Sequence, residues 1–269
     1  MEISRLYDIL DRYLEKFPNQ DAALACKREG KWRKFSIQEY VDLTNQISYG
    51  MLKLGIEPGD RIGIVSNNRP EWNMLDFATM QIGAISIPIY ATISQDDYRY
   101  ILNHSEMKMI FIEGKELRLK VMPILPEIKS LKYVYTFVDQ GTGLPFLEQL
   151  IQLGRENPAP EKLQQLKAMQ KPGDMATIVY TSGTTGNPKG VMLSHSNIVN
   201  QVLNSKQIPA EWDKIALSFL PLCHAYERML VYLYQYLGIS VYYAENLGTI
   251  GENIKEVNPN IMATVPRVL

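Results

Sequence analysis

The sequence predicts an α/β protein in which strands alternate with helices and form largely parallel sheets. From about residue 56 onward, short apolar runs of strand length alternate with amphipathic stretches of helix length. Glycine and proline mark the changes between them, as at Pro58-Gly59 and at Gly83. Strands that are joined through helices pair in parallel, which is why the alternation favours parallel sheets. Hydrophobic residues make up 46% and charged residues 21% of the chain, a normal balance for a protein that buries a core.

The first 55 residues predict two helices with a hairpin between them. Glu29-Gly30 separates two runs of strand character, which is typical of a hairpin turn. The spacing Ser36-x-x-Glu39 is that of a capping box and predicts where the second helix starts. The expected ranges are a helix over 4–17, strands over 22–26 and 31–35, and a helix over 37–54.

The regular alternation continues to the end of the chain. A polar, proline-marked stretch from residue 157 to residue 172 predicts an exposed excursion between two of the strands. The expected strands are 61–66, 84–89, 108–112, 133–138, 175–180, 214–220, 239–243 and 261–265. The expected helices are 70–83, 94–104, a proline-broken piece after 112, segments from 145 and from 160, 196 onward, 226–237 and 249 onward.

Composition limits the classes of partner and compartment. The formal net charge is −1 and no block of lysine and arginine stands out, so nucleic acid is not expected as a partner. Two cysteines, Cys26 and Cys223, do not form a disulfide framework, which fits a reducing compartment. The charged N-terminus lacks the apolar core of a signal peptide, and the longest uncharged apolar run, 229–244, is short for a membrane span. A cytoplasmic protein is expected, and surface contact with a membrane stays open.

One stretch, residues 180–190, concentrates groups that bind polyphosphate. It holds four serine and threonine side chains, three glycines and Lys189, and we expect it to be a loop that leaves a strand and returns toward a helix. Glycines let backbone N–H groups turn toward a ligand, hydroxyls add donors, and lysine adds a mobile positive charge. The alternative is an ordinary linker, because clusters of this composition are usually loops. The Walker A motif is absent, since Pro188 stands where that motif needs the glycine before its lysine.

This stretch, with its continuation through 191–195, resembles the phosphate-binding loop of the adenylate-forming enzymes, which include acyl-CoA synthetases, luciferases and adenylation domains. The resemblance implies ATP-dependent activation of a carboxylic acid to acyl-AMP, and then transfer of the acyl group to coenzyme A. It implies that seven residues bind the β- and γ-phosphates of ATP. It also implies that one of them, Thr184, is a ligand of Mg²⁺. The seven residues are Thr181, Ser182, Gly183, Thr184, Thr185, Gly186 and Lys189.

A second candidate is His224, which follows the expected strand 214–220. Taken alone, it is better explained as a hydrogen-bonded interior histidine than as a residue that acts beside a carboxylate. Its context, Pro221-Leu222-Cys223-His224, resembles the segment that lines the carboxylate site in adenylate-forming enzymes, which implies a catalytic His224. The apolar helix after it is explained by a core position or by the wall of a fatty-acyl channel. No G-x-S-x-G or H-E-x-x-H motif is present, so neither a serine hydrolase nor a zinc site is supported.

The branch of the family is indicated by four further segments. His224-x-x-Glu227, together with the segments 66–72, 88–92 and 264–268, resembles the long-chain fatty acid–CoA ligases. The implied protein binds a fatty acid, ATP and coenzyme A, uses Mg²⁺ and belongs to fatty acid metabolism. The open alternatives are activation of another acid, aryl or amino, and a non-catalytic nucleotide-binding protein.

The resemblance is still running when the sequence stops at Leu269. Family members continue with the adenine-binding segment, an acidic Mg²⁺ ligand, a ribose-binding aspartate and the lysine of a mobile C-terminal domain. We therefore expect an incomplete N-terminal adenylation domain that is inactive by itself. Its expected subregions are about 1–55 plus 197–269, and about 56–196.

Overall fold

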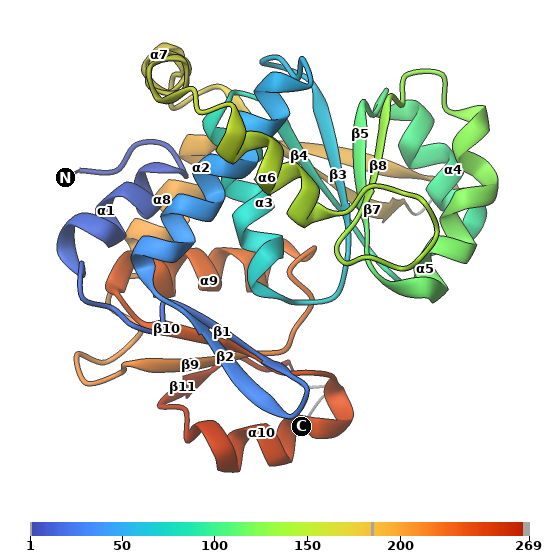
Figure 1. Ribbon diagram of the computed structural model, residues 1–269. Helices are drawn as coiled ribbons and strands as arrows, with labels where there is room; N and C mark the ends of the chain where they lie inside the picture. The colour runs from blue at the N-terminus through green and yellow to red at the C-terminus, as the bar shows by residue number, and fades with distance from the viewer. Residues whose placement is uncertain (1, 184–185, 266–269) are drawn as a thin grey trace. The chain divides into compact units, whose positions relative to one another are not determined.

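The computed structural model describes residues 2–183 and 186–265 and confirms the predicted fold class (Figure 1). The chain divides into two compact units. The first unit contains Met1–Asp42, Asn68–Met74 and His195–Leu269, and the second contains Leu43–Asn67 and Leu75–Ser194. Each unit has its own sheet and is described by itself.

The first unit is built on a five-stranded sheet in the order β11-β9-β10-β1-β2, in which only β2 is antiparallel to its neighbour. β1 and β2 form the predicted hairpin, and Glu29 and Gly30 at its turn have φ of 49° and 76°. The strands are β1 (Leu24–Arg28), β2 (Lys31–Phe35), β9 (Ile215–Ser218), β10 (Ser240–Tyr243) and β11 (Ile261–Met262). The first unit also holds α1 (Asp8–Lys16), α8 (His195–Ser205), α9 (Ala225–Leu237), the 3₁₀ turn η2 (Leu247–Thr249) and α10 (Ile250–Val257).

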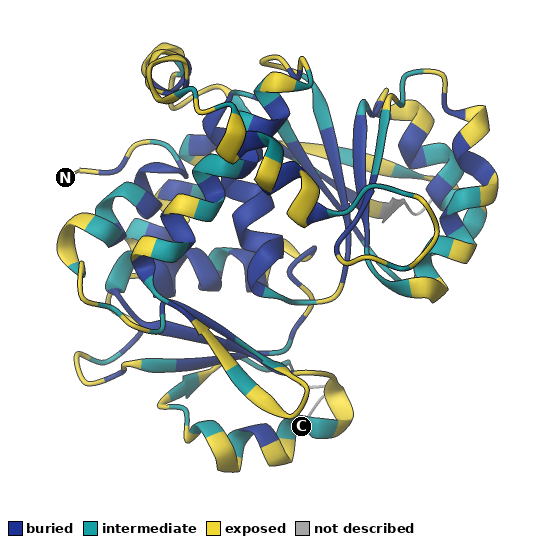
Figure 2. Ribbon diagram, viewed as in Figure 1, coloured by how far each residue is buried: buried dark blue, intermediate teal, exposed yellow. Residues whose placement is uncertain are grey.

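Helix α9 forms much of the core of this unit, as its dark blue colour in Figure 2 shows. Val231, Tyr232 and Leu233 are completely buried, which supports the core explanation of its apolar pattern. The helix ends at Gly238, whose φ of 77° is left-handed. A Cβ there would lie 2.5 Å from Cζ of Phe17, so both the conformation and the space require glycine.

The second unit is built on a six-stranded sheet in the order β6-β5-β3-β4-β7-β8. All neighbouring pairs are parallel except β7 and β8. The strands are β3 (Arg61–Val65), β4 (Ile85–Ile89), β5 (Met109–Ile112), β6 (Tyr133–Thr136), β7 (Met175–Gly183) and β8 (Gly186–Ser194). The helices after β4 and β5 are α4 (Gln95–His104), α5 (Gly114–Val121) and the 3₁₀ segment η1 (Met122–Glu127), and those after β6 are α6 (Leu147–Glu156) and α7 (Pro160–Met169).

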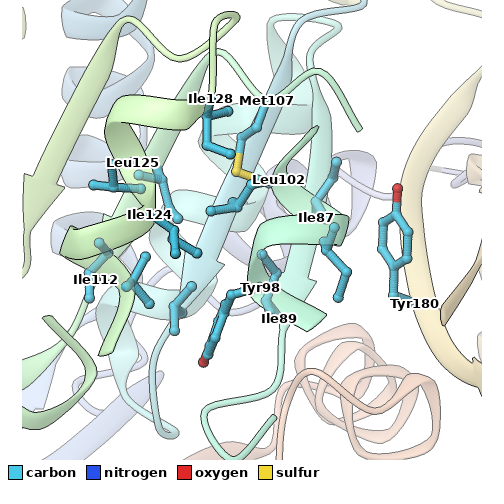
Figure 3. Packing of buried hydrophobic residues seen from close by; sticks show 14 residues of the cluster. Ile87, Ile89, Tyr98, Leu102, Met107, Ile112, Ile124, Leu125, Ile128 and Tyr180 are labelled. Atoms are coloured by element: carbon cyan, nitrogen blue, oxygen red, sulfur yellow. The ribbon is translucent and has the colours of Figure 1, made fainter. Parts of the chain in front are cut away.

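The core on one face of this sheet is apolar (Figure 3). Ile87, Leu102 and Ile112 come from β4, α4 and β5 and are completely buried. Helix α4 begins with a full capping box in which the Ser94 hydroxyl accepts from Asp97 N at 3.0 Å and the Asp97 carboxylate binds the Ser94 hydroxyl and N–H. Asp96 and Asp97 therefore lie in the first turn of α4.

Helices α2 (Ile37–Lys53) and α3 (Pro70–Gln81) each have residues in both units. Within the second unit, α2 and α6 approach closely because glycine stands at the contact. A Cβ on Gly154 would lie 1.7 Å from the carbonyl oxygen of Gln46, and one on Gly50 would lie 2.4 Å from that of Leu150. The predicted capping box of α2 is only half formed, since Glu39 N donates to the Ser36 hydroxyl at 3.1 Å while the Glu39 carboxylate pairs with Arg33.

Within residues 2–183 and 186–265, no helix combines the length and the apolar character that crossing a membrane requires.

Candidate functional site

The glycine-rich stretch 180–190 forms a hairpin, which corrects the expectation of a loop between a strand and a helix. Its first residues extend β7 and its last residues belong to β8, which pairs antiparallel with β7 and leads into α8. The physical reason is the sequence after the glycines, Val191-Met192-Leu193, which has strand character and pairs with 177–179. Because of this pairing, the polar residues up to Gly183 belong to β7, and those from Gly186 onward belong to β8.

The hairpin brings two predicted phosphate ligands together. Thr181 and Lys189 are cross-strand partners and both side chains are exposed. Directly opposed residues have their Cβ atoms about 5 Å apart, so a hydroxyl and an ammonium are presented side by side. Gly186 has φ of 119°, which favours glycine at the end of the turn. Of the other candidates, Thr184 and Thr185 lie outside the described residues, and for Ser182 and Gly183 the structure describes only the backbone.

The base of the hairpin is fixed by Tyr180. Its hydroxyl lies 2.8 Å from Nδ1 of His104, the last residue of α4, and Tyr100 stacks on that imidazole. Across the strand pair the tyrosine faces Gly190, where a Cβ would lie 2.9 Å from Cγ2 of Ile178 and 3.3 Å from Cζ of Tyr180. Burial raises the pKa of Tyr180 to about 12, so the phenol stays neutral at physiological pH. The hairpin therefore projects from an anchored base.

His224 stands in the first unit, between the end of β9 and the start of α9. It is the N-cap residue of α9 and its side chain is exposed. The protein around the ring still removes part of its hydration, which lowers the pKa of His224, so the neutral imidazole is favoured at pH 7. A neutral imidazole has one donor and one acceptor nitrogen. It can therefore donate a hydrogen bond to an anionic group although the ring itself carries no charge.

The turn that carries His224 is held by Asn68. The Asn68 Nδ2 donates to the carbonyl oxygen of Leu220 at 2.7 Å and to the Ser218 hydroxyl at 3.3 Å. Its Oδ1 accepts the N–H of Leu222 at 2.9 Å. One side chain thus satisfies three groups on the segment between β9 and His224, and it fixes the backbone there.

A buried carboxyl group lies behind the same turn. Glu227, in the first turn of α9, is 2% exposed and its Oε1 accepts from the Ser218 hydroxyl at 2.6 Å. Its Oε2 is buried and has no hydrogen-bond partner among the described residues. Burial raises the pKa of Glu227 to about 7, and the Ser218 hydrogen bond partly opposes this rise.

Two neighbouring residues have structural rather than chemical roles. Cys223 is 5% exposed and burial raises the pKa of its thiol to about 12, so it is not a thiolate nucleophile. His195 is 1% exposed and its Nδ1 accepts the backbone N–H of Leu6 at 3.2 Å. His195 is therefore an interior residue that stabilises the fold.

The predicted site residues fall in both units, with the hairpin in the second and His224 in the first. The sequence interpretation missed the roles of Asn68, Ser218 and Tyr180. Asn68 and Leu222 are far apart in the chain, and only the fold pairs them. Ser218, a polar residue at the end of an apolar strand, was the one local sequence signal that could have indicated such a role.

The described residues offer no group of three or more His, Cys, Asp and Glu side chains that would hold a metal. A hollow of about 730 Å³ in the second unit lies between the end of α2 and the start of α7. Tyr49, Leu52, Ile56 and Pro158 line it, and the predicted site residues do not.

The sequence is similar to a known family and to curated proteins. It matches the family model described as AMP-binding enzyme over residues 10–269. It is 33% identical over 258 residues to fatty acyl-CoA synthetase A of Dictyostelium discoideum, covering 91% of this chain and 38% of that protein. It is 30% identical over 285 residues to the peroxisomal long chain acyl-CoA synthetase 7 of Arabidopsis thaliana, covering 99% of this chain and 40% of that protein. The chain thus spans about two-fifths of the length of these relatives.

Solved structures share the fold. A long-chain-fatty-acid-CoA ligase from Archaeoglobus fulgidus superposes with a TM-score of 0.80 at 24% identity, over 98% of this chain and 52% of that one. The anthranilate CoA ligase AuaEII, solved with anthranoyl-AMP, superposes with a TM-score of 0.84 at 21% identity, over 98% of this chain and 50% of that one. At these identities the likeness concerns the fold.

Proposed function

Because the chain belongs to the AMP-binding enzyme family, we propose that it supplies the phosphate-binding hairpin and the carboxylate-facing histidine of a long-chain fatty acid–CoA ligase. The observation that carries the choice of branch is the 33% identity to a fatty acyl-CoA synthetase along 91% of this chain. The proposed reaction has two steps. A fatty acid carboxylate attacks the α-phosphate of ATP and releases pyrophosphate, and the thiol of coenzyme A then displaces AMP.

In this proposal the hairpin holds the β- and γ-phosphates. The donors run from Thr181 to Gly186, and Lys189 adds positive charge beside Thr181. A hydrogen bond to a charged group contributes about 1.5–3 kcal/mol, so several that converge hold a triphosphate. The anchored Tyr180 supports the role, because a rigid base lets the donors be oriented before the nucleotide binds.

His224 is proposed as the catalytic residue beside the substrate carboxylate and the α-phosphate. Its lowered pKa supports a neutral imidazole at pH 7. A neutral ring can donate one hydrogen bond to a carboxylate or phosphate oxygen and adds no positive charge beside Mg²⁺. Mg²⁺, with Thr184 as its proposed protein ligand, would neutralise phosphate charge when bound. Lys189 is a phosphate-binding residue in this scheme and takes no part in proton transfer.

A cytoplasmic location with contact at a membrane surface belongs to the same proposal. Two large apolar side chains between α8 and β9 support the contact, Ile208 with 67% and Trp212 with 77% of their surface exposed. An aromatic residue of this kind is favoured at a membrane interface.

The test is palmitate-dependent ATP–pyrophosphate exchange. It compares this chain with the protein translated from its complete reading frame, since the relatives are longer. We expect exchange from the longer protein and none from the 269-residue chain alone. Lys189→Met should lower kcat/KM for ATP by about 10- to 100-fold, the loss of one charged contact. Lys171→Met, at an exposed lysine before β7, is the matched control and should leave exchange unchanged.

Each other outcome has a defined meaning. Exchange by the chain alone would contradict the proposal that it lacks necessary parts. Exchange by the longer protein with aryl or amino acids, and not with palmitate, would replace the substrate class. If ATP binds and no acid supports exchange, the non-catalytic nucleotide-binding alternative takes its place.

A further inference from the structure

We propose that Glu227 is a positioning residue of the carboxylate-facing turn, and that it holds the turn as a neutral carboxylic acid. This inference rests on the proposed function of His224, because the turn in question is the one that presents His224. It goes beyond the proposed function by identifying Glu227 as a residue that positions His224 and by specifying that Glu227 is protonated.

A continuous chain of hydrogen bonds links Glu227 to the backbone before His224. The carboxyl Oε1 accepts from Ser218 at 2.6 Å, Ser218 is in turn bonded to Asn68, and Asn68 holds Leu220 and Leu222. Ser218 is completely buried, so its hydroxyl has little freedom to find another partner. Glu227 lies three residues after His224, in the first turn of α9. Its hydrogen bond to Ser218 therefore connects the start of α9 to the end of β9, and the segment that carries His224 lies between these two points.

The surroundings of Glu227 favour its neutral form. It is 2% exposed, accepts one hydrogen bond and has one buried oxygen with no partner. A buried carboxylate normally pairs with a cation or accepts several donors, because an unpaired buried charge is very costly. In the same unit Glu71 shows the contrast, since it pairs with Arg69 at 2.9 Å and with Arg28 and its pKa is lowered.

Two tyrosines are electrostatically coupled to Glu227. Tyr234 lies on the same helix and Tyr243 on β10, and Glu227 contributes to the raised pKa of each. Both phenols are neutral at physiological pH, so neither stabilises a negative charge on Glu227. The neighbouring Arg228 is directed elsewhere, with its Nε 2.8 Å from the Tyr232 hydroxyl and its guanidinium over the Trp72 ring.

Ionisation of Glu227 should therefore loosen the turn. The charged carboxylate gains free energy by rotating toward water, and this rotation breaks the bond to Ser218. The expected pH profile of kcat/KM has a rising limb set by His224 and a falling limb near neutral pH set by Glu227. The Glu227→Gln variant keeps an acceptor for Ser218 and cannot ionise, so it should retain activity below neutral pH and lose the falling limb.

Two measurements test this, one of them independent of activity. Difference infrared spectroscopy on this chain should show a protonated carboxyl band that disappears near pH 7 in wild type and is absent from Glu227→Gln. The pH profile of exchange is then measured on the protein from the complete reading frame. Glu252→Gln, an exposed glutamate in the first turn of α10, is the matched control and should change neither result.

The variant Ser218→Ala tests the same inference by changing the pKa of Glu227 instead of removing its carboxyl group. Removing the hydroxyl removes the interaction that lowers the pKa of Glu227, so the infrared transition and the falling limb should both move to higher pH. An infrared spectrum without the protonated band at pH 6, or a Glu227→Gln profile identical to wild type, overturns the inference. If the wild-type longer protein exchanges with no acid, the proposed function has failed, while the infrared titration still decides the state of Glu227.

Discussion

Replacing Glu227 with glutamine should change how the stability of the first unit depends on pH. Burial holds the folded-state pKa of Glu227 at about 7, above its ordinary value of 4.5. Between these values the folded protein binds more protons than the unfolded one, so stability falls as pH rises. The stabilising contribution of the protonated group is complete below about pH 4.5 and is lost as pH rises through about 7. Glutamine has no such contribution to lose.

The size of the effect follows from the same two values. A change in pKa from 4.5 to about 7 corresponds to about 3.5 kcal/mol, because one pKa unit is worth about 1.4 kcal/mol. From pH 5 to pH 8 the wild type should therefore lose about 2 to 3 kcal/mol relative to Glu227→Gln. The group is almost fully buried, so screening by solvent does not reduce this figure much.

The assay is urea unfolding followed by tryptophan fluorescence. Trp32, Trp72 and Trp212 are the three tryptophans of the chain and all belong to the first unit, so the signal reports the unit that holds Glu227. The difference in free energy of unfolding between wild type and variant is measured at several pH values. A difference that stays constant from pH 5 to pH 8, or that grows in favour of wild type as pH rises, would refute the reasoning. Glu252→Gln should give a constant difference near zero.

Three further changes test packing around the hairpin and the second unit. Gly154→Ala places a Cβ where it would lie 1.7 Å from the Gln46 carbonyl oxygen, so urea unfolding should show a loss of about 3 kcal/mol or more; Gly251→Ala, where a Cβ meets nothing within 4 Å, should be neutral or slightly stabilising. Tyr180→Phe removes the 2.8 Å contact with His104 and should cost about 1 kcal/mol, with faster hydrogen exchange in β7 and β8 as the local readout; unchanged exchange there would mean that the tyrosine does not anchor the hairpin. Ser94→Ala should cost about 1 kcal/mol through loss of the α4 cap, measured by urea unfolding, and no loss would show that the Asp97 side of the capping box suffices.

Local signals in the sequence predicted much of the fold. The turn at Glu29-Gly30 and the start of α4 at Ser94 are set by residues within a few positions of each other, and both are confirmed. The hairpin over 175–194 was missed because its glycines and hydroxyls have the composition of a loop. Its pairing depends on the register between β7 and β8, which composition does not contain.

The site was less predictable than the fold. His224 and the glycine-rich stretch could be singled out as candidates because each belongs to a short local motif whose residue types suggest a chemistry. Asn68 was not, because its partners Leu220 and Leu222 become neighbours only when the chain folds. The raised pKa of Glu227 has the same origin, since burial by distant strands and not the local sequence determines it.

The way the first unit is assembled from separate stretches of chain has a consequence for synthesis. β1 pairs with β10, where Leu24 lies opposite Val241, so one side of β1 stays unpaired until β10 has also left the ribosome. The second unit draws its residues from Leu43–Asn67 and Leu75–Ser194 and is complete much earlier. Such distant pairing slows folding, and an unpaired strand edge is prone to association with other chains. Ribosome-bound nascent chains that stop before β10 should therefore be the species that depends most on chaperones.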